Sequence, residues 1–492
     1  MTWVRVDVAA PAVSGDTVVF RWTQSEPNPF QHENCFYLRY EGLDLTRFSS
    51  SLFYEIFLGL QLRVFKSYGR AVEVVFPEPV PHPTVAFWQA YHHADLVTIA
   101  PIAETASYSP WTSPQPTPQH RRPTAVFFGG GKDSMLTTCL LSELHGADSV
   151  LLLQFVHPFR RGPAELDRLA RRQEELMLRP AREKLGVATQ RAWTDYLAQF
   201  RVSRTGQGVR PHLELYSLGF LPALLEWGVS VCSPGIERSA YRAARRADGR
   251  LVYRYVQSRP EVLAAQSTHY RRVLGAELTV TNLNLLFTTL MDFRLLAERY
   301  PGAFEQVVMC VAPSPEERWC YQCLNCVEYA FFSLGLGIVD PRFDYDRFFA
   351  QSKYIERLIE YAESGVELSM FGNAPWQPFF SVAGHYLSFC HAIAQIEPRL
   401  LAARLGPDAF ANLTVVKALF GNRRFPNQEM LSTKSVDLIG TDLARAVARI
   451  AAEHLEVVED LPGPSWTGEE EVIFDFDVRI PTRTARLEHI RS

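Results

Sequence analysis

The chain has 492 residues, of which 47% are hydrophobic and 21% are charged, and its net charge is −4. This composition excludes a disordered chain, and the mild negative charge gives no general attraction for nucleic acid phosphates, which argues against a tRNA substrate. With no signal-peptide pattern, no long uncharged apolar run for a membrane span and no disulfide-type cysteine framework, we expect a cytoplasmic protein.

Residues 1–115 are predicted to form a separate α+β domain that ends in a linker. Strands are expected at Val4–Val8, Val18–Trp22, Cys35–Tyr40, Ala71–Phe76 and Leu96–Ile99, and a helix at Ser50–Phe65. His92 and His93 are expected to be a solvated pair at a helix end. The segment 108–123 has five prolines and no aliphatic residue, which is typical of a linker and sets the boundary near residue 115.

A strand, a glycine turn and a helix follow the linker. The apolar run Thr124–Phe128 predicts a buried strand, and the spacing of apolar residues from Met135 to Leu144 predicts a helix. Between them stand Gly129, Gly130 and Gly131, followed by Lys132, Asp133 and Ser134. A glycine turn at a helix N-terminus gathers N–H donors and the positive end of the helix dipole, so it predicts an anion site, most often for phosphate.

Two common phosphate loops do not fit this turn. A Walker loop needs glycine where Val126 stands, and a dinucleotide fingerprint needs glycine where Ser134 stands. The segment Gly129–Ser134 instead resembles the PP-loop of the ATP pyrophosphatase superfamily, Ser-Gly-Gly-x-Asp-Ser. That resemblance implies cleavage of ATP to AMP and pyrophosphate, with the loop glycines, Lys132 and Ser134 on the phosphates and Asp133 positioning Mg²⁺ or the loop itself.

Strands and helices alternate after the loop, which predicts a doubly wound parallel sheet in a domain spanning residues 116–305. We expect an α/β fold of the PP-loop, Rossmann-like type. Its ligand should bind beyond the carboxyl ends of the strands. The strand Val229–Cys232 leads to Glu237 and Arg238 at this same edge, so both are candidate catalytic residues beside Lys132 and Asp133.

A cysteine cluster opens the last predicted region, residues 306–492, which we expect to be a mostly helical extension. Its members are Cys310, Cys320, Cys323 and Cys326. The C-x-x-C-x-x-C spacing with one distant cysteine is typical of a structural zinc site, and it resembles the zinc site of cyano-deazaguanine synthases. An iron–sulfur cluster on three of the cysteines and unligated core thiols are the alternatives.

Four stretches between residues 120 and 385 together resemble the UDP-N-acetylmuramoyl-L-alanyl-L-glutamate epimerase (MurL) family. They are Phe128–Ser134, Glu237–Ala240, Trp319–Cys326, and Gln377–Phe380 with Val382 and Gly384. The resemblance implies that ATP adenylates the α-carboxylate of the terminal L-Glu in a UDP-linked muramoyl dipeptide or a related peptide. The α-carbon then inverts, and hydrolysis releases AMP and the D-Glu product.

The chain departs from that family where the family's acid and thiol are replaced by Phe380 and Ser381. If either of those groups transfers the proton in the family, this protein uses another base or catalyses another reaction. His385, which directly follows the matched stretch, is our candidate base. The alternative activity is a PP-loop ligase or amide synthetase that captures the acyl adenylate with an amine. A nucleotide-binding protein without turnover is a third possibility, which the intact Lys132, Asp133 and Ser134 disfavour.

Overall fold

The computed structural model describes residues 3–112, 122–157, 163–200, 212–238, 244–245, 251–252, 256–310, 316–363, 383–422, 424–459 and 461. The predicted linker lies mostly outside these ranges. Within them, no helix has both the length and the hydropathy needed to cross a bilayer.

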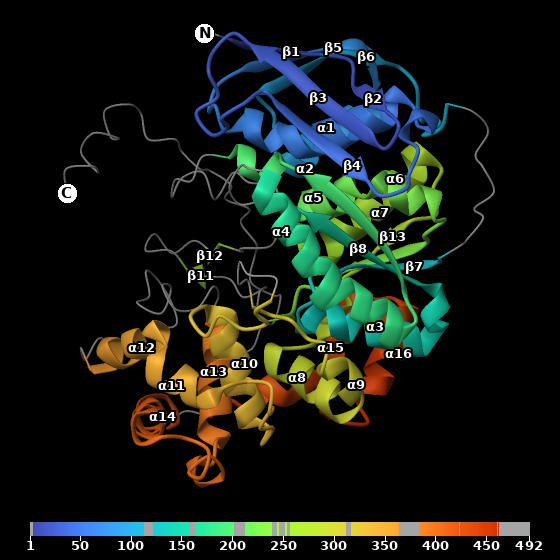
Figure 1. Ribbon diagram of the computed structural model, residues 1–492. Coiled ribbons are helices and arrows are strands. Elements are labelled where there is room, and N and C mark those ends of the chain that lie inside the picture. Colours follow the sequence, from blue (N-terminus) through green and yellow to red (C-terminus); the bar gives the residue numbers. More distant parts are fainter. Residues whose placement is uncertain are drawn as a thin grey trace.

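The N-terminal part of the chain contributes one edge of a large sheet and two helices (Figure 1). Its elements are β1 (Val4–Val8), β2 (Ala12–Ser14), β3 (Thr17–Gln24), β4 (Cys35–Tyr40), α1 (Ser50–Lys66), β5 (Val72–Pro81), α2 (His82–His92) and β6 (Val97–Ala103). The predicted strands and the predicted helix are confirmed, most of them within two residues at each end. The exceptions are β5 and β6, which extend five and four residues farther at their C-terminal ends, and β2 and α2 were not predicted.

The middle of the chain forms a parallel sheet flanked by helices. Its elements are β7 (Thr124–Phe127), α3 (Lys132–His145), β8 (Val150–Val156), α4 (Pro163–Gln173), β9 (Ala188–Thr194), α5 (His212–Gly219), α6 (Leu221–Glu226), β10 (Val231–Pro234), α7 (Pro260–Leu274), β13 (Thr279–Val280) and α8 (Thr289–Glu298). The strands lie in the order β13-β10-β7-β8-β9, and all four pairings are parallel. The chain therefore leaves β7 towards β8 on one side, and β10 joins β7 on the other side. The result is an α/β fold with the predicted alternation of strands and helices.

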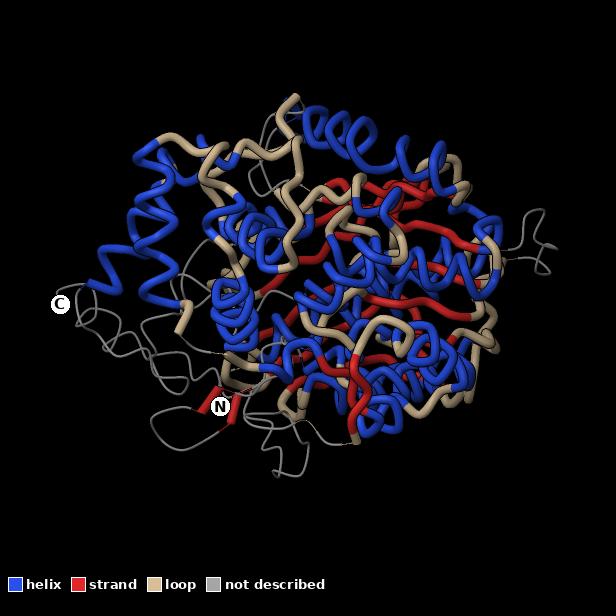
Figure 2. Tube along the Cα trace, turned by 90° about the horizontal axis from the view of Figure 1, so that it is seen from below, coloured by secondary structure: helices blue, strands red, loops and turns tan. Residues whose placement is uncertain are grey.

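One sheet crosses the predicted domain boundary near residue 115. Strand β4 pairs antiparallel with β9, with Leu38 opposite Thr194 and Tyr40 opposite Ala192. This pairing joins both groups of strands into an 11-stranded mixed sheet in the order β13-β10-β7-β8-β9-β4-β3-β1-β5-β6, with β2 paired to β3. Seen from below, the strands form a layer with helices on both sides (Figure 2). The N-terminal part thus extends the central sheet instead of forming a sheet of its own.

The two faces of the parallel strands pack into two cores. Val126 and Leu152 lie on one face, in a core with Leu136 of α3, while Phe127 and Leu151 lie on the other, in a core with α1, α5 and α6. Alternate side chains of a strand point to opposite faces, so strands buried on both faces need the continuous apolar runs seen in this sequence.

The C-terminal part is mostly helical and packs under the sheet (Figure 1). Its elements are α9 (Pro301–Phe304), α10 (Leu324–Gly335), α11 (Tyr345–Gln351), α12 (Lys353–Glu363), α13 (Ala383–Gln395), α14 (Pro407–Phe420), β14 (Met430–Ser432), α15 (Thr433–Ile439), α16 (Asp442–Ala451) and β15 (Glu456–Val458). Earlier in the chain, β11 (Ala244–Arg245) and β12 (Leu251–Val252) form a separate antiparallel pair. The apolar side chains of the C-terminal helices share the core that contains α3.

His92 corrects the expectation of a solvated histidine pair. Helix α2 ends at His92, whose side chain is 6% exposed, and His92 Nε2 lies 2.8 Å from the carbonyl oxygen of Gly59 in α1. Only His93 is exposed. Burial lowers the pKa of His92 from 6.5 to about 3, because the interior disfavours the charged imidazolium.

This burial predicts a pH dependence of stability. Below about pH 6.5 the unfolded chain binds a proton at His92, whereas the folded protein does not until about pH 3. His92 should therefore lower the free energy of unfolding by about 1.4 kcal/mol for each unit by which the pH falls in this range. Urea unfolding between pH 4 and 7 measures the slope. His92→Asn should flatten it relative to the wild type, and replacement of the exposed His145 by Asn should leave it unchanged. An equal slope in wild type and His92→Asn would contradict the assignment.

Candidate functional site

The glycine turn lies between the carboxyl end of β7 and the N-terminus of α3. Gly131 is the residue before the helix, which begins at Lys132. A Cβ atom added at Gly129 or Gly131 would meet no described atom within 4 Å, so a ligand can approach the backbone closely here. Ser134 holds the turn from inside, because its Oγ accepts from the N–H of Gly129 at 3.3 Å and donates to the carbonyl of Gly131 at 3.2 Å.

Position 130 requires glycine for two reasons. Its φ of +73° lies in the left-handed region, and a Cβ atom there would come within 2.8 Å of Met177. Its carbonyl accepts a hydrogen bond from the N–H of Val308 at 2.8 Å. The turn is therefore held from the C-terminal side by the segment that leads to the cysteine cluster.

The loop after β10 lies beside this turn, as the parallel pairing of β7 and β10 requires. Gly235 packs on the start of α3, where an added Cβ atom would be 3.0 Å from the backbone nitrogen of Ser134. Glu237 is 3% exposed and accepts a hydrogen bond from the hydroxyl of Thr289 in α8. The chain order changes direction between β7 and β10, the place where ligands bind in open α/β sheets.

Arg238 has a different environment from the one we predicted for a catalytic residue. It is 5% exposed, and its guanidinium donates to the backbone carbonyls of Asn427 at 3.0 Å and of Met430 at 3.2 Å. A guanidinium with several donors suits such carbonyls. In the described structure Arg238 therefore joins the edge of the sheet to the C-terminal region.

Lys132 lies in an acidic environment. It is 4% exposed, and its Nζ atom is 2.6 Å from Asp133 Oδ1 and 4.0 Å from Asp292 Oδ2. Burial by itself would lower the pKa of Lys132, but the negative charges of Asp133, Glu237 and Asp292 outweigh it and raise this pKa above its usual value. The ammonium group is thus kept charged at the base of the turn.

Asp292 is a site residue that the sequence analysis missed. It lies in the first turn of α8, which Thr288 caps by accepting from the N–H of Met291. Asp292 is fully buried, and burial together with the neighbouring carboxylate of Asp133 raises its pKa well above the usual value. The start of α8 carries a Thr cap and an early acid, which predicts a helix N-terminus, but nothing local predicts its contact with a turn about 160 residues earlier.

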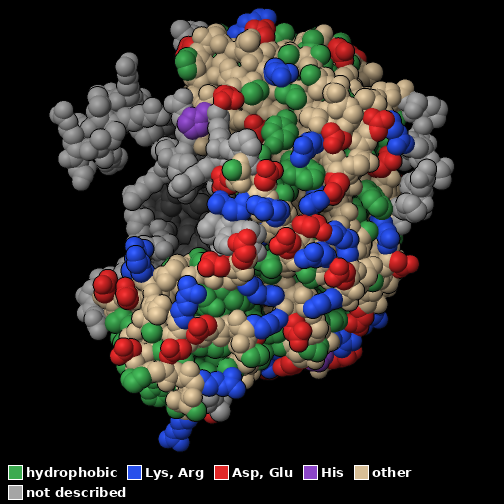
Figure 3. Space-filling view, viewed as in Figure 1, with side chains coloured by type: hydrophobic (Ala, Val, Ile, Leu, Met, Phe, Trp, Pro, Cys, Tyr) green, Lys and Arg blue, Asp and Glu red, His purple; other side chains and the backbone are tan. Residues whose placement is uncertain are grey.

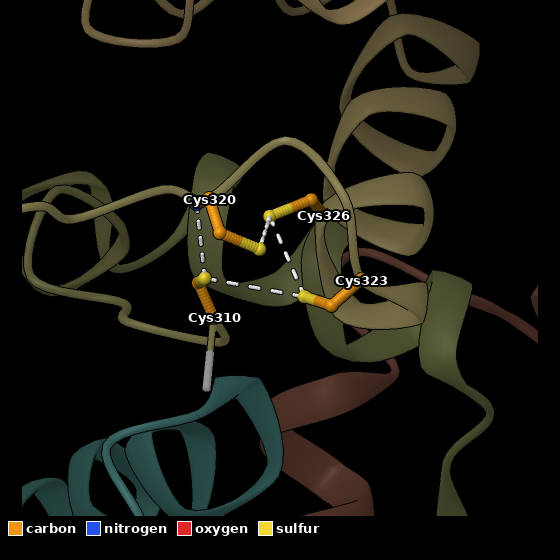
Figure 4. A group of neighbouring side chains, drawn as sticks. All are labelled: Cys310, Cys320, Cys323 and Cys326. Carbon is orange, nitrogen blue, oxygen red and sulfur yellow. Dashed lines mark hydrogen bonds between the residues drawn. The ribbon is translucent and has the colours of Figure 1, made fainter. Parts of the chain in front are cut away.

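The four predicted cysteines converge on one point (Figure 4). The Sγ–Sγ distances are 3.6 Å between Cys323 and Cys326, 3.9 Å between Cys310 and Cys323, and 3.9 Å between Cys320 and Cys326. A zinc ion with tetrahedral Zn–S bonds of about 2.3 Å has sulfur atoms about 3.8 Å apart. All four cysteines are free of disulfides. The cluster therefore has the donors and the spacing of a closed metal site.

Backbone groups and one arginine support this cluster. The N–H of Cys320 donates to Cys310 Sγ at 3.1 Å, and the N–H of Gln322 donates to Cys320 Sγ at 3.4 Å, contacts that stabilise thiolates. Arg172 of α4, which is 3% exposed, donates to the carbonyl of Cys310 at 3.0 Å. In a metal site the four cysteines would be thiolates, and the positive charge of Arg172 would offset part of their negative charge. No local pattern around Arg172 predicts this role.

His385 lies in the first turn of α13, which packs against α10 and α8. Its side chain falls outside the described residues, as does the matched stretch Gln377–Phe380. The structure thus brings together the glycine turn, Lys132, Asp133 and Glu237, with Arg238 directly beyond them. No protein-family model and no curated protein matches this chain, so the geometry of its own residues carries the functional argument.

Proposed function

We propose that this protein is an ATP pyrophosphatase of the PP-loop type with a Rossmann-like fold, which activates a carboxylate by forming an acyl adenylate. The observation that carries the proposal is the open glycine turn between β7 and α3, with a buried, charged lysine at its base. The turn supplies N–H donors and the positive end of the α3 dipole, both suited to phosphate oxygens. Lys132 supplies a full positive charge where pyrophosphate would leave.

We further propose that the activated carboxylate belongs to the terminal L-Glu of a UDP-linked muramoyl dipeptide or a related peptide, and that the α-carbon is inverted. The carboxylate oxygen attacks the α-phosphorus of ATP, and pyrophosphate leaves. A free carboxylate resists loss of the α-proton because a second negative charge would form beside the first. The adenylate removes that charge, so a base takes the proton, a proton returns to the opposite face, and water releases AMP.

The two metals have separate places in this proposal. Mg²⁺ is expected to accompany the nucleotide, with Asp133 nearest the turn. The four cysteines fit zinc, which would fix the backbone between residues 310 and 326 and take no part in the reaction. On the face shown in Figure 3, the described acidic and basic side chains are interspersed and form no broad basic patch, which supports a small-molecule substrate over a nucleic acid.

The test is ATP turnover with UDP-MurNAc-L-Ala-L-Glu in deuterated water. We expect AMP and pyrophosphate to form together with deuterium at the α-carbon of the glutamate, measured by ³¹P NMR and mass spectrometry. AMP formation with a mass gain from an added amine, and no deuterium at the α-carbon, would assign the ligase activity instead. Accumulation of ADP would contradict the pyrophosphatase class altogether.

A further inference from the structure

Three carboxylates from separate parts of the chain meet below the glycine turn. Asp133 comes from α3, Glu237 from the loop after β10, and Asp292 from α8, and one oxygen atom of each lies within 4.8 Å of the others. Their side chains differ in exposure, because Asp133 is partly exposed whereas Glu237 and Asp292 are buried. A small ion therefore has access from the side of Asp133, and the two buried carboxylates form the floor.

Asp292 carries the argument for a ligand at this place. Its side chain is 0% exposed, and no described N–H or hydroxyl group donates to either carboxylate oxygen. Its polar neighbours are the carboxylate of Asp133 and the ammonium group of Lys132. Its nearest cation is Lys132, at 4.0 Å from Oδ2 and therefore beyond hydrogen-bond distance. A buried carboxylate without hydrogen bonds is costly unless a cation binds it. One lysine ammonium, already 2.6 Å from Asp133, faces all three carboxylates.

We propose that these three carboxylates form a binding site for one divalent cation of the Mg²⁺ or Mn²⁺ type, which is occupied without nucleotide. All the donors are carboxylate oxygens, which suit these hard cations and are a poor match for zinc or copper. Neighbouring oxygens around an octahedral Mg²⁺ are about 2.9 Å apart and opposite ones about 4.2 Å apart, so the three oxygens are expected to move closer together when the cation binds. Lys132 then turns from Asp133 towards the glycine turn.

This inference goes beyond the proposed function, since the cation is expected to bind whether or not the protein binds ATP. The measurement is a titration of the zinc-loaded, nucleotide-free protein with Mn²⁺, followed by the electron paramagnetic resonance signal of free Mn²⁺. We expect one bound Mn²⁺ that Mg²⁺ displaces. Asp292→Asn should weaken its binding by about tenfold or more. Glu298→Gln, on the same helix but exposed, should bind Mn²⁺ as the wild type does.

Thermal unfolding gives a second readout. Mn²⁺ should raise the Tm of the wild type and leave that of Asp292→Asn unchanged. Without Mn²⁺ the Asn variant should be at least as stable as the wild type, because a buried carboxyl group without a hydrogen-bond donor is gone. Glu237→Gln provides an independent variant if Asp292→Asn does not fold, and it should show the same loss of Mn²⁺ binding. The proposal is overturned if Mn²⁺ binds only when ATP is present, if the wild type binds none, or if the folded variants bind it as tightly as the wild type.

Discussion

Replacing Lys132 with Ala should lower the rate of AMP formation by about 10²- to 10³-fold, the usual loss when a preorganised charge at a reacting centre is removed. Lys132 is the buried cation of the glycine turn, and its ammonium group lies at the N-terminus of α3. Single-turnover measurements with saturating ATP and substrate separate this loss from a weaker affinity for ATP. We expect the main loss in the chemical step, because the charge acts on the leaving pyrophosphate.

The surroundings of Lys132 require a control for folding. Its removal leaves Asp133, Glu237 and Asp292 without their common cation, which lowers stability. Lys132→Gln retains hydrogen-bond donors and a similar length, and it should be folded by circular dichroism yet nearly as slow as Lys132→Ala. Replacement of the exposed Lys184 by Ala should leave turnover unchanged. Wild-type rates in a folded Lys132→Gln variant would rule out the role of this charge.

Replacing Cys323 with Ser should remove the bound metal and cost on the order of 5 kcal/mol or more of unfolding free energy, because structural zinc contributes directly to folding. Cys323 lies 3.6 Å from Cys326 and 3.9 Å from Cys310, at the centre of the cluster. The metal content of freshly purified protein by elemental analysis and the Tm are the two measurements. Cys35→Ser, which lies outside the cluster, should retain both zinc and the wild-type Tm.

Loss of the metal should also weaken the packing that holds the glycine turn. Cys310 follows two residues after Val308, whose N–H holds the carbonyl of Gly130 at 2.8 Å. Chelation of the metal should therefore weaken the binding of nucleotide under conditions where circular dichroism still reports a folded sheet. Iron with visible charge-transfer absorption would assign the iron–sulfur alternative, and protein that is stable with neither zinc nor iron would contradict the metal site.

Local features of the site could be predicted from the sequence because neighbouring residues define them. The glycine turn follows from an apolar run, three glycines and the apolar spacing from Met135 onwards, all within about twenty residues. The cysteine cluster follows from a short spacing that lets thiolates converge from one turn and one helix start. The position of Glu237 near the turn followed from one general rule, that parallel strands end at a common edge.

Other features depend on contacts between distant residues, which a single sequence does not record. The antiparallel pairing of β4 with β9 joins residues about 155 positions apart and merges two expected sheets into one. Arg172 of α4 donates a hydrogen bond to the carbonyl of Cys310, 138 positions farther along the chain. Asp292 and Arg238 have ordinary neighbours in sequence, and only packing decides that one is buried beside Lys132 and the other bonds to carbonyls near residue 430. Chain proximity determined the turn and the cysteine cluster, whereas the tertiary fold alone decided which charges are buried together.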